Sequence, residues 1–145
     1  MADVASKVLT LTAVTGTTTL RDTHFSTKAM RDFIFSVEVS ASASGGSDTL
    51  AVTIQGTNTD EGNISTSNDN YWTTLVTFSN ILGNASTPSI VHRDLLGDLT
   101  SASTNSLRPA VPKWMRIKYV TTDVSASSSF TAKIRIAWNT AVVTS

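Results

Sequence analysis

The sequence predicts an all-β protein, a two-sheet antiparallel β-sandwich of the jelly-roll type. The first observation is strict alternation in two C-terminal segments, 114–120 and 130–138, where apolar side chains take one face and cations the other. The second is composition, because Ser and Thr make up roughly a third of the chain while charged residues are only 15%, against about 25% in typical globular proteins. Thr favours strands and Ser favours turns. The third is that helical periodicity never extends beyond a turn or two.

The N-terminal part of the chain predicts a short polar arm and three strands. The arm covers about residues 1–6, and the first strand covers 8–12, before a turn at Gly16. A second, short strand is expected at 17–20. The longest clean alternation lies at 30–40, and it predicts a central strand. Its apolar face carries Phe33, Phe35, Val37 and Val39.

The middle of the chain predicts two further strands around a polar loop. The first strand ends at Gln55-Gly56, and its apolar face carries Leu50, Val52 and Ile54. Residues 57–70 are polar apart from one isoleucine and predict a long loop. The second strand covers 71–78, with one face formed by Trp72, Thr74, Val76 and Phe78. The region 79–112 has the weakest pattern, with short apolar stretches only.

The C-terminal part completes a single domain that spans 1–145. A proline-framed extended segment at 108–112 leads into the strand at 114–120, and the strand at 130–138 closes the fold. The whole chain predicts seven or eight strands separated by turns. A jelly-roll is favoured over an immunoglobulin-like sandwich, since the mid-chain connections are long and the Cys–Trp–Cys spacing of immunoglobulins is missing.

Residues for catalysis or metal binding are scarce. The chain has no cysteine, so thiolate metal sites, disulfides and thiol nucleophiles are excluded. His24 and His92 are the only histidines, and neither has a partner at ligand or triad spacing. The loop at 58–70 gathers carboxylates and amides that suggest calcium, but an ordinary solvated loop is favoured because the spacing does not fit an EF-hand. We therefore expect a protein that is not an enzyme and has no cofactor or metal.

Charge and hydropathy bear on partners and location. The net charge is zero at pH 7, which argues against nucleic acid and anionic membranes as partners. No apolar run approaches the ~18 residues that a membrane-spanning helix needs. The first residues lack the basic and apolar segments of an export signal. We expect a protein made in a cytoplasm.

Four cations in the two C-terminal strands are candidate interface residues: Arg116, Lys118, Lys133 and Arg135. All four are expected to point away from the core, and they form one basic stripe if their strands are neighbours. Solubility and protection of strand edges explain such cations adequately and are favoured. The sharper alternative is docking to an acidic protein surface, where charge complementarity fixes the register of binding.

Trp72 and Trp114 are the aromatic candidates. An exposed indole face offers apolar contact to a sugar ring, so a saccharide platform is one interpretation. A place in the sandwich core or in an oligomer interface is favoured.

Several segments resemble small structural proteins of tailed-bacteriophage virions. They are TLAVTIQGTN at 49–58, YWTTLVTF at 71–78, PKWMRIKYV at 112–120 and the closing strand at 130–137. The resemblance covers about half of the chain. It implies a capsid decoration, or cement, protein that forms a homotrimer, binds the major capsid protein and lies on the capsid surface. No catalytic residues follow from it.

Two other functions stay open. A tail-associated or baseplate-associated structural protein would share this composition and fold. A carbohydrate-binding β-sandwich module would require Trp72 or Trp114 to be exposed on a flat or concave face.

Overall fold

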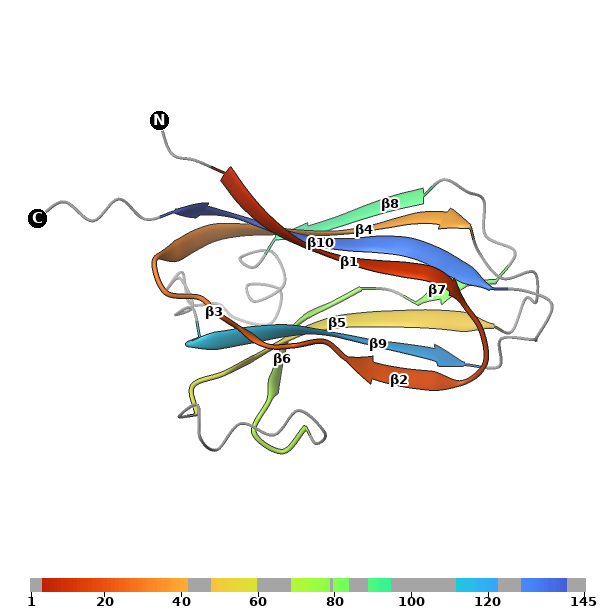
Figure 1. The fold of residues 1–145 in the computed structure, drawn as a ribbon, viewed down its shortest axis with the longest axis horizontal. Coiled ribbons are helices and arrows are strands. Elements are labelled where there is room, and N and C mark those ends of the chain that lie inside the picture. The colour runs from red at the N-terminus through yellow and green to blue at the C-terminus, as the bar shows by residue number, and fades with distance from the viewer. Residues whose placement is uncertain are drawn as a thin grey trace, which may run out of the picture.

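A computed structural model describes residues 4–41, 48–59, 69–78, 80–83, 89–94, 112–122 and 129–140 of the 145-residue chain. Within these ranges the protein consists of strands, turns and bends, without a helix. The strands are β1 (Val4–Val14), β2 (Thr18–Arg21), β3 (Phe25–Ser26), β4 (Met30–Ala41), β5 (Thr49–Thr57), β6 (Thr73–Thr77), β7 (Ile81–Leu82), β8 (Ser89–Asp94), β9 (Trp114–Thr122) and β10 (Phe130–Thr140). Figure 1 shows them along the chain.

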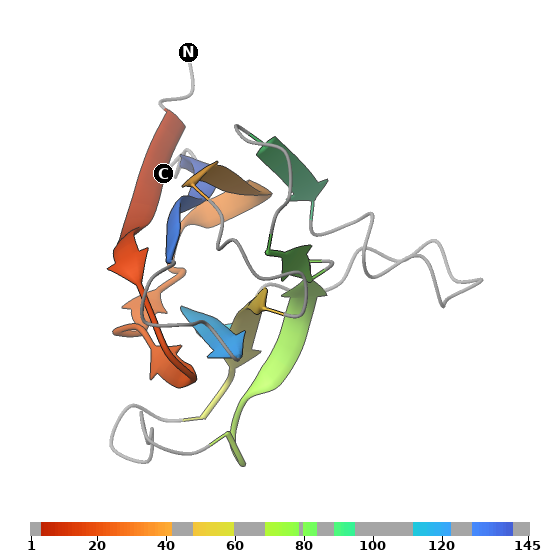
Figure 2. The same cartoon turned by 90° about the vertical axis from the view of Figure 1, so that its right-hand side faces the viewer.

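The strands form two antiparallel sheets that lie face to face (Figures 1 and 2). Sheet A has the order β1-β10-β4-β8, and sheet B has the order β2-β9-β5-β6, with β3 added beside β9 and β7 beside β5. The predicted all-β class and the two-sheet antiparallel sandwich are therefore confirmed. The jelly-roll topology stays a prediction with which these strand orders are compatible.

The chain crosses repeatedly between the two sheets. It passes from β1 in sheet A to β2 in sheet B, from β3 to β4, from β4 to β5, and again from β7 to β8, from β8 to β9 and from β9 to β10. Many strands that pair are consequently distant in sequence, as β1 is from β10, whereas β5 pairs with the next strand, β6. The two C-terminal strands, β9 and β10, are consecutive in sequence but belong to different sheets.

One apolar core lies between the sheets. The alternation seen in the sequence explains it, because every second side chain of β4, β9 and β10 points inward. The buried core residues are Leu11, Phe33, Phe35, Val37, Val39, Leu50, Val52, Ile54, Val76, Phe78, Met115, Ile117, Tyr119, Phe130, Ala132, Ile134 and Ile136. Both sheets contribute to this one cluster.

A bulge in β6 corrects one prediction. Val76 pairs with Ile54 and Thr74 pairs with Gln55, so Leu75 is one extra residue in the ladder. The extra residue moves the side chains before it to the opposite face. Trp72 and Thr74 were predicted to share a face with Val76, which is wrong, because the bulge places them on the outer side of sheet B.

Several strands extend or add to the predicted ones. β1 begins at Val4, so residues 4–6 of the expected arm pair with β10. β8 lies in the region with the weakest sequence pattern and pairs with β4. In the described part of the chain, no helix is long and apolar enough to cross a membrane.

Candidate functional site

The outer face of sheet B carries a concentration of polar side chains. Arg116 of β9 pairs in register with Gln55 of β5, and Lys118 of β9 pairs with Arg21 of β2. Since Ile117 and Tyr119 point into the core, Arg116 and Lys118 must point away from it. Three adjacent strands thus place cations and an amide on one surface.

Asp69, in the segment before β6, is the acceptor at the centre of this surface. Arg21 donates to it through Nε at 2.9 Å and Nη2 at 3.0 Å, in a two-point contact. Nη2 of Arg116 lies 2.5 Å from Oδ1 of Asp69, and Nζ of Lys118 lies 2.7 Å from Oδ2. A single carboxylate therefore ties β2 and β9 to the chain that enters β6.

Arg116 is fully buried, although it lies on the outer face of its sheet. Its Nε donates to Oε1 of Gln55 at 2.8 Å, and its guanidinium carbon lies 4.1 Å from the centre of the Trp72 ring. Trp72, which is 7% exposed, covers the cation from outside. Arg116 thus points away from the core, as expected, but it is not exposed to solvent, because residues 69–72 fold over it.

The charges perturb one another. Hydrogen bonds from Arg21, then from Lys118, hold the pKa of Asp69 well below its usual range. The hydrogen bond to Asp69 raises the pKa of Arg21. Burial lowers the pKa of the Arg116 guanidinium, and the charge of Asp69 opposes that shift. The lowered pKa of Asp69 keeps its carboxylate ionised throughout the neutral range.

An aromatic row continues from this network. The His24 ring meets the Trp114 ring edge to face at 5.2 Å between centroids, and lies tilted at 6.3 Å from the Trp72 ring. Nδ1 of His24 is buried and has no hydrogen-bond partner among the residues that the structure describes. His24 therefore fills the space between the two indoles.

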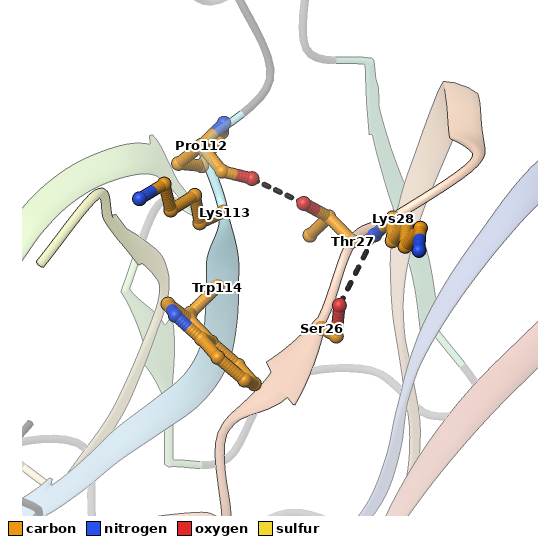
Figure 3. Close-up of a pocket in the computed structure, with 6 residues that line it drawn as sticks. All are labelled: Ser26, Thr27, Lys28, Pro112, Lys113 and Trp114. Carbon is orange, nitrogen blue, oxygen red and sulfur yellow. Dashed lines mark hydrogen bonds between the residues drawn. The ribbon is translucent and has the colours of Figure 1, made fainter. Parts of the chain in front are cut away.

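A pocket of about 420 Å³ lies at the end of sheet B, beside Trp114 (Figure 3). Its lining residues come from β3 with the turn that follows it, and from the beginning of β9: Ser26, Thr27, Lys28, Pro112, Lys113 and Trp114. In Figure 3 the Trp114 indole lies along the pocket, and Lys28 and Lys113 stand on opposite sides of it.

The four candidate cations do not form one basic stripe. β9 and β10 belong to different sheets, so Arg116 and Lys118 lie outside sheet B while Lys133 and Arg135 lie outside sheet A. Arg116 and Lys118 are engaged with Asp69. The two remaining cations are exposed on the opposite side of the sandwich.

Lys133 and Arg135 lie beside exposed apolar side chains. Arg135 pairs in register with Val8 of β1, and the next outward residue of β10 pairs with Ile34 of β4. Val8 is 42% exposed and Ile34 is 55% exposed. We call the outward residues Val8, Ile34, Lys133 and Arg135 the sheet A face; Glu38 of β4, which pairs in register with Lys133, points outward from the same sheet. None of the ion pairs between described residues includes either cation of this face.

The two candidate tryptophans have different surroundings. Trp72 is buried over Arg116 and offers almost no surface to a ligand. Trp114 is half-buried and lines the pocket. The structure thus separates two residues that the sequence treats alike.

Sequence reasoning missed Asp69 and Gln55 as members of the ion network. Asp69 lies in a Ser/Asn/Asp stretch that predicts a solvated loop, and Gln55 only marks the end of a strand. The sequence did contain one signal. Arg116 lies at an outward position of its strand, and Gln55 is a polar residue at the end of the strand that pairs with it. Using it requires the pairing of β9 with β5, which the pattern alone does not give.

The described residues contain no group of three or more His, Cys, Asp or Glu side chains arranged to hold a metal ion. Of the loop at 58–70, residues 60–68 lie outside the described residues, and the carboxylate of Asp69 is hydrogen-bonded to the side chains of Arg21 and Lys118. His92 lies in β8, where the backbone pairs it with Ser36.

The amino-acid sequence matches no protein-family model, and no curated protein is significantly similar to it.

Proposed function

We propose that this protein is a non-enzymatic structural protein of a tailed-bacteriophage virion, a capsid decoration protein that docks on an acidic surface of the head lattice. The observation that carries the proposal is the sheet A face. There Lys133 and Arg135 are exposed, near the apolar side chains of Val8 and Ile34. Neither cation belongs to an ion pair of the described residues. The resemblance of the strand segments to small virion proteins supports the same assignment.

The chemistry of the sheet A face suits an acidic protein partner. The two cations at outward positions of β10 outnumber the one carboxylate opposite them, Glu38, and so favour a surface of Asp and Glu; such complementarity fixes the register of docking. Val8 and Ile34 then lose their exposed apolar surface to the partner, which adds an attraction that does not depend on salt.

Assembly multiplies these modest contacts. A homotrimer on a symmetric lattice presents three copies of the sheet A face at once, so each protomer needs only a weak contact. Homotrimer formation belongs to the proposal, and light scattering of the purified protein tests it.

The decisive experiment uses phage heads assembled without this protein. We expect the wild type to co-sediment with these heads and to raise the temperature at which they break open. The Lys133→Glu/Arg135→Glu variant should bind at least about tenfold more weakly, because two attractive contacts become repulsive. Lys28→Glu/Lys113→Glu makes the same charge change beside the Trp114 pocket and should bind like the wild type.

Two outcomes would refute the proposal. One is the absence of both co-sedimentation and added thermal resistance. The other is equal loss of binding in the two double variants, which would show a general charge effect. A tail or baseplate location is the main rival, and immunogold labelling of virions distinguishes it by position.

A further inference from the structure

The Trp114 pocket is separate from the sheet A face. Trp114 pairs in register with Thr57 on one side and Ser26 on the other, and it extends from the outer side of sheet B. Lys133 and Arg135 extend from the outer side of sheet A. A ligand in this pocket would therefore occupy the opposite side of the sandwich from the proposed docking surface.

Backbone groups at the pocket are already bonded within the protein. The Thr27 N–H donates to the Lys113 carbonyl at 3.0 Å, and the Thr27 hydroxyl donates to the Pro112 carbonyl. The Lys113 N–H donates to Oδ1 of Asn58 at 2.9 Å, and the Lys28 N–H reaches Oγ of Ser26 at 3.3 Å. An extended peptide would find few backbone groups here with which to form a strand. Recognition is left to side chains.

The side chains at the pocket define a chemical class of ligand. The Trp114 indole provides an apolar wall, the Ser26 hydroxyl can donate its hydrogen, and the exposed Lys28 carries positive charge. A ring that has one apolar face, several hydroxyls and a carboxylate matches all three groups. We propose that this pocket binds an acidic saccharide, with a pyranose ring against Trp114 and its carboxylate toward Lys28.

The pocket is organised before any ligand arrives. His24 packs edge to face on Trp114, which restricts the orientation of the indole. Pro112 is buried against Gly56, where a methyl group would approach its Cγ to 2.5 Å. Since both walls are fixed by packing, a ligand does not have to order them on binding.

The test is a titration of the full chain with digalacturonate, followed by Trp fluorescence and calorimetry. Neutral galactobiose and an acetylated tetraglutamate peptide are titrated in parallel. We expect digalacturonate to bind and both comparison compounds to bind at least about tenfold more weakly. Trp114→Ala should abolish binding and Lys28→Gln should weaken it by roughly tenfold, because they remove the apolar wall and one charge. Lys133→Gln, the matched change on sheet A, should leave it unchanged.

The contrary results are equally definite. Absence of digalacturonate binding would overturn the proposal, as would binding that survives both Trp114→Ala and Lys28→Gln. Preferred binding of tetraglutamate would assign the pocket to an acidic peptide instead. Lys28 is exposed, so its variant gives a result even where Trp114→Ala fails to fold. None of these measurements involves phage heads, so their outcome is independent of the proposed decoration function.

Discussion

The guanidinium carbon of Arg116 lies 4.1 Å from the centre of the Trp72 ring, and Arg116 is completely shielded from solvent. A buried cation is costly unless it is paired and hydrogen-bonded, and Asp69 and Gln55 supply these contacts. The contacts of Arg116 with Trp72 and Asp69 thereby hold residues 69–72, which precede β6, on the outer face of β9.

Truncation of Arg116 should destabilise the fold through lost packing and an unpaired amide. We expect Arg116→Ala to lower the free energy of unfolding by about 2–4 kcal/mol, because Trp72 loses its support and Gln55 loses its donor. Arg116→Met also removes the donor to Gln55 but keeps most of the packing against Trp72, so it should cost less, about 1–2 kcal/mol. Urea unfolding followed by Trp fluorescence measures both, and equal losses in the two variants would contradict this account.

Asp69 should make stability depend on acid pH. Its pKa is lower in the folded protein than in the unfolded chain, so its ionised form contributes stability above the unfolded value, which lies near 3.8. This contribution is fully present at neutral pH and is lost progressively as the pH falls below about 4. The wild type should therefore lose thermal stability between neutral pH and pH 2 more steeply than Asp69→Asn does.

The control for Asp69 is Asp22→Asn, which removes a carboxylate from a single, longer contact with Lys7 at 3.6 Å. We expect its acid profile to stay close to that of the wild type, since a partly exposed pair of this kind contributes little. If Asp69→Asn and the wild type show parallel profiles from pH 7 to pH 2, the ion network does not govern acid stability.

Gly56 has no room for a side chain. A Cβ there would lie 2.5 Å from Cγ of Pro112 and 2.8 Å from Cδ1 of Leu75. We expect Gly56→Ala to cost about 1–3 kcal/mol through overpacking. Gly16→Ala is the comparison, because its Cβ would meet open space and only the positive φ of 76° is strained, at about 1 kcal/mol. Thermal melts rank the two, and a greater loss for Gly16→Ala would refute the packing argument.

Two isoleucines of sheet A should differ in their importance for stability. Ile134 of β10 is fully buried, whereas Ile34 of β4 is 55% exposed on the sheet A face. Ile134→Ala should cost about 2–5 kcal/mol, and Ile34→Ala should stay within about 0.5 kcal/mol of the wild type. Chemical denaturation measures both. A large loss for Ile34→Ala would mean that this side chain supports the fold and is not available to a partner.

The strand class and the buried faces follow from alternation, because a period of two residues assigns each side chain to one of two sides. The core positions of β4, β9 and β10 were predictable for this reason. Alternation does not say which sheet a strand joins. The four cations form one stripe only if their two strands are neighbours. The crossover between β9 and β10 instead puts Arg116 and Lys118 on one side of the sandwich and the other two cations on the opposite side.

The ion network was not predictable for a related reason. Asp69 contacts Arg21 and Arg116, which lie 48 and 47 residues away in sequence, and only the order β2-β9-β5-β6 brings them together. The place of Trp72 depends on the extra residue in β6, and a bulge leaves no clear trace in the pattern of apolar residues. Polar partners that meet across strands are thus the part of this molecule that needs the structure.

The anchoring of Asp69 also bears on how this protein can vary. At the other end of the same connection, the Thr57 hydroxyl accepts from the Thr59 N–H and donates to its hydroxyl, so both ends are fastened to sheet B. Residues inserted between these two fixed points would leave the registers of β5 and β6 untouched. The connection is accordingly where an epitope or affinity tag could be grafted while both sheets keep their pairing.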